Sequence, residues 1–123
     1  MGGTSQPGVT VFRFADDFEA FSAGQAIFST GQPGEMMYVV KEGEVEVIIN
    51  GKVIDTVGPG GIIGEMALID KRPRSATAVA KTDCKLVSVN EQRFQRLVQQ
   101  TPHFALQVMK IMAQRLRQMD AQA

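Results

Sequence analysis

The sequence predicts a mainly β fold with flanking helices: a small antiparallel roll or barrel of short strands followed by two C-terminal helices. Turn-forming residues separate short apolar runs about every eight residues between Gly24 and Gly61, which is typical of many short strands. The dipeptide Asn50-Gly51 joins two of these runs and tolerates the positive φ angles of a tight hairpin turn. After Val89 the apolar spacing changes to the period of helices.

The N-terminal part of the chain gives the weakest structural signal. Residues 1–10 are rich in Gly, Ser, Thr and Pro, so we expect a flexible tail there. A single domain is expected over residues 11–123, because that length suits one hydrophobic core. Residues 11–23 contain apolar side chains without a clear period, and the sequence predicts neither helix nor strand for them.

The clearest strands form a hairpin in the middle of the chain. Residues 44–49 and 52–57 are rich in Val and Ile, and the turn Asn50-Gly51 joins them. A second pair of strands is expected over residues 77–89, where the polar residues 81–83 form the turn. All of these segments are predicted to be β.

Two helices are expected after the strands. Asn90 can cap the first helix, and Thr101-Pro102 offers a second cap with proline at the first helical position. The second helix has a wide apolar stripe that must lie against other parts of the chain. We expect this stripe to consist of Leu106, Met109, Ala113 and Leu116, with Val108, Met112 and Met119 beside them.

Charge and cysteine content exclude several classes of protein. Thirteen basic and thirteen acidic residues cancel, so no overall field attracts nucleic acid or an anionic membrane. The only cysteine, Cys84, excludes an internal disulfide and fits a reducing compartment. No signal peptide is visible, and no apolar run approaches the ~18 residues of a membrane span. We therefore expect a cytoplasmic protein with a small or locally recognised partner.

One stretch, GEMALIDKRPRSATA from Gly64 to Ala78, concentrates the candidate functional residues. A short helix after Gly64 presents free backbone N–H groups, which together with the helix dipole favour an anion. The planar fork of Arg74 can reach the same point. One arginine and a few backbone donors suit the single charge of a phosphodiester better than a triphosphate. Glu65 accepts hydrogen bonds only, so it suits a sugar hydroxyl beside that phosphate.

The pattern GEMALID, followed after a short gap by PRSATA, resembles the phosphate-binding cassette of the cyclic nucleotide-binding domain family. This family includes bacterial catabolite regulators, regulatory subunits of cAMP-dependent kinase and gated channels. Residues 27–43 also resemble the early strands of the family, and the likeness covers roughly residues 20–118. It implies an eight-stranded antiparallel β-roll, similar to a jelly roll, that holds cAMP or cGMP.

The resemblance also implies roles for individual residues. Glu65 would bind the ribose 2′-hydroxyl and Arg74 the cyclic phosphate, and the helix over residues 103–120 would close over the base. Arg115, Arg117 or a Met or Leu side chain of this helix would cap the base. The ligand-binding residues implied by the family pattern are Gly64, Glu65, Met66, Ala67, Arg74, Ser75 and Ala76. The hydroxyl of Ser75 occurs in bacterial cAMP receptors of the family and favours cAMP over cGMP.

This interpretation predicts a non-catalytic receptor module without cofactor or metal. Ligand binding would move the C-terminal helix and thereby regulate a protein effector. A homodimer through the C-terminal helix is left open. Two alternatives remain: a degenerate β-roll that binds proteins without a ligand, and a metalloenzyme of the cupin type. The second needs several metal ligands, whereas His103 is the only histidine. The basic residues 71–74 are too few for a nucleic-acid surface.

Overall fold

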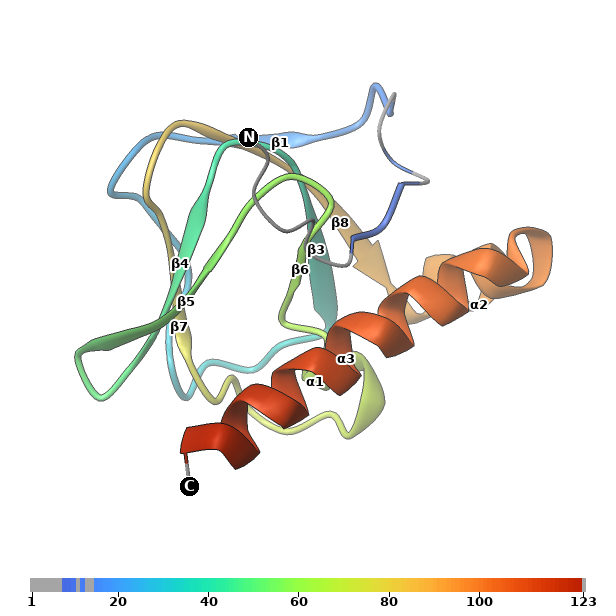
Figure 1. Cartoon of the computed structure of the whole chain (residues 1–123). Coiled ribbons are helices and arrows are strands. Elements are labelled where there is room, and N and C mark those ends of the chain that lie inside the picture. The colour runs from blue at the N-terminus through green and yellow to red at the C-terminus, as the bar shows by residue number, and fades with distance from the viewer. Residues whose placement is uncertain (1–7, 11, 13–14, 123) are drawn as a thin grey trace, which may run out of the picture.

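The computed structural model describes residues 8–10, 12 and 15–122, and for residues 119–122 the backbone alone. Short strands occupy the first three quarters of the chain and helices the last quarter (Figure 1). The strands are β1 (Glu19–Phe21), β2 (Ala26–Phe28), β3 (Met36–Glu42), β4 (Val45–Ile49), β5 (Lys52–Val57), β6 (Ile62–Ile63), β7 (Thr77–Ala80) and β8 (Cys84–Asn90). The helices are α1 (Met66–Ile69), α2 (Glu91–Gln100) and α3 (Pro102–Gln122).

The strands form two four-stranded sheets, in the orders β1-β8-β3-β6 and β2-β7-β4-β5. Every recorded pairing is antiparallel. In Figure 1 the sheets enclose a roll, and α2 and α3 lie on the side of the roll formed by β3, β6 and β8. The predicted eight-stranded antiparallel roll with two C-terminal helices is therefore confirmed.

The central strand β3 is buried on both of its faces, as its continuous apolar sequence requires. Met37 and Val39 point towards the helices, whereas Tyr38 and Val40 point into the roll. This alternation follows from the two-residue period of a strand. The inner core of the roll also contains Val45, Val57, Ile63, Ala78, Ala80, Cys84 and Leu86. One strand thus connects the interior of the roll to the layer under the helices.

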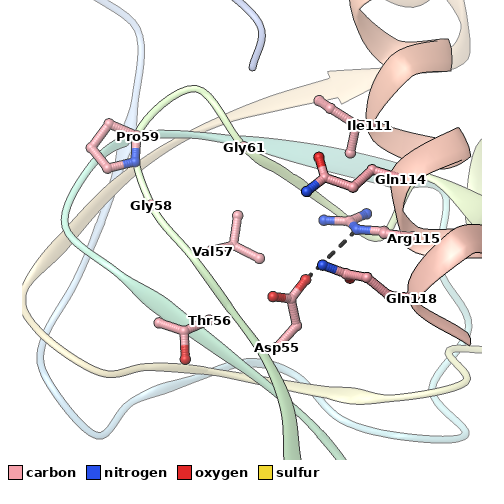
Figure 2. Close-up of a pocket in the computed structure, with 10 residues that line it drawn as sticks. All are labelled: Asp55, Thr56, Val57, Gly58, Pro59, Gly61, Ile111, Gln114, Arg115 and Gln118. Atoms are coloured by element: carbon pink, nitrogen blue, oxygen red, sulfur yellow. Dashed lines mark ion pairs between the residues drawn. The ribbon is translucent and has the colours of Figure 1, made fainter. Parts of the chain in front are cut away.

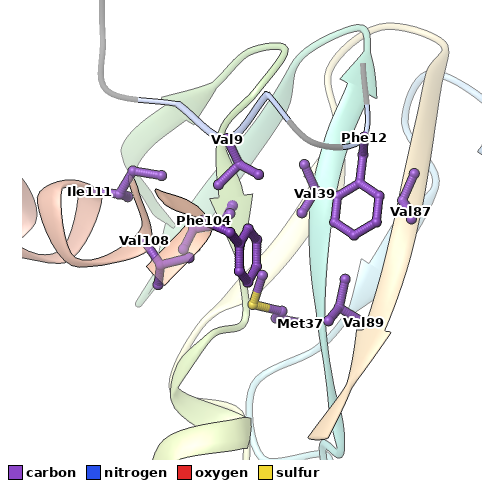
Figure 3. Packing of buried hydrophobic residues seen from close by; sticks show 10 residues of the cluster. Val9, Phe12, Met37, Val39, Val87, Val89, Phe104, Val108 and Ile111 are labelled. Carbon is purple, nitrogen blue, oxygen red and sulfur yellow. The ribbon is translucent and has the colours of Figure 1, made fainter. Parts of the chain in front are cut away.

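The outer core fixes the start of α3 against the first sheet (Figure 3). Phe104 is completely buried there, and its ring packs edge-on against Phe94 of α2 and against Phe12, at centroid distances of 5.4 and 6.4 Å. Val108 and Ile111 continue the contact along α3. Burial of three large apolar side chains contributes several kcal/mol in total, at about 1.5–3 kcal/mol each.

The buried face of α3 agrees only in part with the predicted stripe, since Val108 is buried and Met112 packs against the outer core. Phe104, Val108 and Ile111 are buried, whereas Leu106, Met109 and Leu116 of the expected stripe are 46, 56 and 62% exposed. The helix is apolar around much of its circumference, so the spacing alone did not decide which side faces the core. The position of Phe104 between two other aromatic rings decides it.

The predicted turn at Asn50-Gly51 and the predicted cap at Asn90 are present. Asn50 and Gly51 adopt φ angles of 52° and 77° and join β4 to β5. A bulge at Val47 and Ile48 shifts the register of this hairpin by one residue. Asn90 caps α2, because its side chain accepts a 2.8 Å hydrogen bond from the backbone N–H of Arg93.

The segment before β1 packs on the roll as soon as the structure describes it. Val9 is 3% exposed, and its N–H donates a 2.6 Å hydrogen bond to the carbonyl of Gly60. Residues 8–10 belong to the segment expected to be a flexible tail, yet they are held at the loop before β6. The rest of that expected tail, residues 1–7, lies outside the described residues. No helix in the described part of the chain has the length and apolar character needed to cross a membrane.

Candidate functional site

The short helix α1 and the loop that follows it form the centre of the candidate site. Gly64 directly follows β6 and has a φ of 74°, which glycine adopts at little cost. The chain then turns through Glu65 into α1, and the N–H of Ala67 donates a 3.2 Å hydrogen bond to the Gly64 carbonyl. This bond closes the first turn. The predicted helical turn after Gly64 is therefore present, with one of its expected free N–H groups already used.

The Arg74 side chain is buried and points back to the start of this turn. It is 8% exposed, and its Nη1 donates to the carbonyl of Gly64 at 3.1 Å. Its Nη2 donates to the carbonyl of Met36 on β3 at 2.7 Å. The guanidinium lies over the ring of Phe28, 4.1 Å from the centroid. Three elements far apart in sequence therefore hold one cation in place.

The backbone around Arg74 is fixed as well. Its N–H donates to the carbonyl of Gln32, and its carbonyl accepts from the N–H of Gly31, both at 2.8 Å. A Cβ atom at Gly34 or Gly64 would collide with the guanidinium. The two glycines therefore leave the space that the arginine occupies.

Arg74 has no carboxylate partner among the described residues, which is unusual for a buried charge. In the same part of the chain its Nε is the one buried side-chain nitrogen or oxygen without a hydrogen-bond partner. Burial lowers the pKa of the guanidinium, and nearby Tyr38 and Glu65 act in the opposite direction. An arginine stays protonated under these conditions. The site thus holds a fixed cation that can accept an anion.

Glu65 is also buried, but it has a cationic partner. Nη1 of Arg115, on α3, donates to its Oε1, and Nη2 of Arg115 donates to the carbonyl of Ile62. Nε of Arg115 lies 3.8 Å from Oδ2 of Asp55 on β5. One guanidinium therefore connects α3 to the residues on both sides of the loop between β5 and β6.

A cavity of about 340 Å³ lies between β5, the following loop and α3 (Figure 2). Arg115 lines it, so the cavity adjoins the partner of Glu65. In Figure 2, Asp55 and Val57 reach from the strand towards α3, and Arg115 and Gln118 reach back from the helix. The lining residues are Asp55, Thr56, Val57, Gly58, Pro59, Gly61, Ile111, Gln114, Arg115 and Gln118. This volume is within the range of small-molecule pockets.

The structure brings together some of the predicted site residues more closely than others. Gly64, Glu65 and Arg74 form one cluster with α1. Ala67 and Ala76 are buried beside it, whereas Met66 is 47% exposed and Ser75 is exposed. Asp55 was not predicted, because nothing local in its strand marks it. Arg115 was one of several residues considered for the base, and the structure turns it inwards while Arg117 is exposed.

The family model for the cyclic nucleotide-binding domain matches residues 18–101. The chain belongs to the cyclic nucleotide-binding domain family. The match includes the roll, the turn at Gly64 and Arg74, and it ends where α3 begins. The matched residues of this chain include the buried Arg74 and Glu65, while Arg115 of α3 lies beyond them.

Several relatives of this cyclic nucleotide-binding domain are known. A cAMP-dependent protein kinase regulatory subunit of Eremothecium gossypii is 39% identical over 77 residues, which are 63% of this chain and 17% of that protein. The catabolite activator protein of Thermus thermophilus is 31% identical, with a TM-score of 0.73 over 85% of this chain and 53% of that one. The chain therefore spans only part of both proteins.

A third relative matches over almost its whole length. It is a structure from work on a cyclic-GMP-dependent signalling pathway that regulates bacterial phytopathogenesis. Its identity is 29% and its TM-score 0.74, over 88% of this chain and 92% of that one.

The described residues contain no group of three or more His, Cys, Asp or Glu that could hold a metal ion.

Proposed function

We propose that this domain is a non-catalytic receptor module for a cyclic nucleotide, cAMP or cGMP, whose binding changes the position of α3 and so regulates a protein effector. The observation that carries the proposal is Arg74, a buried cation without a carboxylate partner among the described residues. A cyclic phosphodiester has one negative charge and matches that cation. A buried charge that gains a well-placed partner is stabilised strongly.

The rest of the nucleotide fits the neighbouring groups. Glu65 can accept a hydrogen bond from the ribose 2′-hydroxyl, because a carboxylate has more acceptor positions than one arginine uses. The cavity between β5 and α3 adjoins Glu65 through Arg115 and offers room for the base. Phosphate, sugar and base would then be bound by Arg74, Glu65 and the cavity.

The contact between Arg115 and Glu65 gives a physical route from ligand to helix. Arg115 belongs to α3, and Glu65 belongs to the turn that would bind the sugar. A ligand that hydrogen-bonds to Glu65 changes the strength of this contact. A binding event shifts a conformational equilibrium only through such differential contacts. An effector protein that contacts α3 could therefore distinguish the two states.

Relatives support the same function. One relative is described as a regulatory subunit of cAMP-dependent protein kinase, and another comes from work on a cyclic-GMP-dependent signalling pathway. Both descriptions concern regulation by a cyclic nucleotide. A cytoplasmic location is consistent with a receptor of this kind and stays a prediction.

The test is a calorimetric titration of the purified chain, freed of carried-over nucleotide, with cAMP, cGMP and 5′-AMP. We expect saturable binding of a cyclic nucleotide and weaker binding of 5′-AMP. In Arg74→Ala the affinity should fall about a hundredfold, because ~3 kcal/mol is typical for loss of one partner of a buried charge pair. Absence of binding by either cyclic nucleotide would favour the alternative, a β-roll that binds proteins without a ligand.

The exposed side of α3 supports one further expectation, a homodimer through this helix. Leu106, Met109 and Leu116 are all more than 40% exposed and follow a helical spacing. Sedimentation of the wild type and of Met109→Glu should show a dimer that the charged variant dissociates. A monomeric wild type at high concentration would refute this expectation.

A further inference from the structure

The cavity beside α3 contains an acidic group that the proposed function does not yet use. Asp55 lies on β5, and its side chain is 35% exposed. Figure 2 shows its carboxylate directed across the cavity towards Arg115 and Gln118. The 3.8 Å separation from Nε of Arg115 is an ion pair and is too long for a hydrogen bond. This contact therefore leaves the acceptor positions of Asp55 open to another donor.

The charges around the cavity point to the same conclusion. Arg115 is shared between two carboxylates, since it hydrogen-bonds to Glu65 and pairs at longer distance with Asp55. One guanidinium cannot neutralise both acids. A ligand that presents N–H donors to Asp55 would supply the missing positive dipoles. A ligand that presents an acceptor there would be repelled.

We propose that Asp55 is a specificity-determining residue that makes this site prefer cGMP over cAMP. This inference rests on the proposed function, in which the base occupies the cavity. Guanine presents two neighbouring N–H donors, N1–H and the N2 amino group, which match the two oxygens of a carboxylate. Adenine presents one amino donor at N6 next to the acceptor N1. The second carboxylate oxygen would therefore face a lone pair in cAMP and a donor in cGMP.

The amides of Gln114 and Gln118 do not decide between the bases. A glutamine side chain carries both a donor and an acceptor, and it can rotate to suit either purine. A carboxylate is an acceptor in every orientation. Arg115 already donates its two Nη groups to Glu65 and to the carbonyl of Ile62, so among the side chains that line the cavity the discrimination depends on Asp55. It also opposes the family-based expectation from Ser75, which favours cAMP.

The experiment compares cGMP, cIMP and cAMP in calorimetric titrations of the wild type. The base of cIMP keeps N1–H but lacks the N2 amino group, so it offers Asp55 one donor of the guanine pair. We expect the affinity to fall in the order cGMP, cIMP, cAMP, with about tenfold between the first and the last, which is typical of one bidentate base contact. Asp55→Ala should bring the three affinities within about twofold of one another, because the selecting group is gone.

Asp55→Asn provides a second variant of matched shape. Its amide offers one acceptor and one donor, and it can rotate to pair with N6 and N1 of adenine or with O6 and N1–H of guanine, so the preference for cGMP should be lost and the ratio of cAMP to cGMP affinity should rise about tenfold over that of the wild type. Removal of one negative charge affects both anionic ligands alike, so it cancels in this ratio. A thermal melt of each variant verifies that it is folded.

The outcomes separate the two proposals. If the wild type binds no cyclic nucleotide, the proposed function fails. If it binds them with equal affinity or prefers cAMP, the role of Asp55 is overturned while the receptor function stands. If the wild type prefers cGMP and Asp55→Ala keeps that preference, another group selects the base and the inference is again overturned.

Discussion

Arg74 and Glu65 lie close together around the turn at Gly64 and are almost equally buried, yet their charges have different partners. Glu65 has a cationic partner, Arg115, supplied by α3. Arg74 has backbone carbonyls, the ring of Phe28 and an Nε without a partner. The carboxylate of Glu65 thus has its partner within the domain, whereas the guanidinium of Arg74 is held in place without a counter-charge among the described residues.

This difference assigns separate tasks to the two groups. A cation that is held rigidly and lacks an anion provides affinity, because its partner must come from outside. An acid that already pairs with a helix provides communication, because any ligand that contacts it must share or replace the helix contact. Binding strength and signal would therefore depend on different residues of the same cassette.

The largest effect that would sharpen the comparison concerns the ribose. In the wild type a 2′-deoxy cyclic nucleotide should bind about ten- to a hundredfold more weakly than its ribose parent, as expected for a hydrogen bond to a charged group. In Glu65→Ala the two ligands should bind equally. In the control variant Glu46→Ala, on β4, the ratio between the affinities of the ribose and 2′-deoxy ligands should stay as in the wild type. A ratio that persists in Glu65→Ala would mean that another group binds the 2′-hydroxyl.

The second effect concerns the partner of Glu65. Arg115→Ala should lower the free energy of unfolding by about 2 kcal/mol, because a mostly buried carboxylate loses its hydrogen-bonded cation. Arg117→Ala, on the exposed side of the same helix, should change it by less than about 0.5 kcal/mol. Urea denaturation measures both. Equal effects in the two variants would show that the contact with Glu65 contributes nothing.

The third effect is an expected near-absence of change in stability. Arg74→Leu should alter the free energy of unfolding of the nucleotide-free protein by less than about 1 kcal/mol, although it abolishes the charge proposed to bind the phosphate. The reason is that Leu packs on Phe28 and removes an unpartnered buried donor, which offsets the loss of the hydrogen bonds to the carbonyls of Gly64 and Met36. A decrease of more than about 3 kcal/mol in the free energy of unfolding, measured by urea denaturation, would show that Arg74 mainly stabilises the fold.

The smallest effect concerns an exposed ion pair. Asp17 accepts a 2.6 Å hydrogen bond from Arg93, and this bond holds the pKa of the Asp17 carboxyl below its usual 3.8. A depressed pKa contributes stability above the unfolded value, which is lost as pH falls through the folded one. Because Asp17 is largely exposed, Asp17→Asn should cost less than about 1 kcal/mol at pH near 7 and nothing well below the folded pKa. Asp16→Asn is the matched control, and a pH-independent difference would contradict the assignment.

The local parts of the fold were predictable from the sequence. The Asn50-Gly51 turn, the Asn90 cap and the turn after Gly64 each depend on residues within a few positions, and all three are present. The burial of Glu65 and Arg74 is not local information. It depends on β3, on Phe28 and on the two glycines that leave room for the guanidinium.

The parts that the sequence did not predict depend on contacts between distant segments. Arg115 and Glu65 are 50 positions apart, so no spacing rule connects them. The buried face of α3 was predicted only in part, because two sides of the helix are apolar and the sheet contacts only one of them. Residues 19–21 form a strand of three residues, which is too short to show a period.

The two fixed points of α3 have a mechanical consequence. The helix is anchored by Phe104 at its start and held by Arg115 eleven positions later, about 16 Å along its axis. The helix is rigid between these points, so it can pivot about the aromatic cluster at Phe104, and the contact of Arg115 with Glu65 restrains this rotation. When the helix pivots, the residues C-terminal to Arg115 move farther than Arg115 itself. A shift at Glu65 would therefore be magnified at the far end of the helix, where an effector could detect it without contacting the nucleotide.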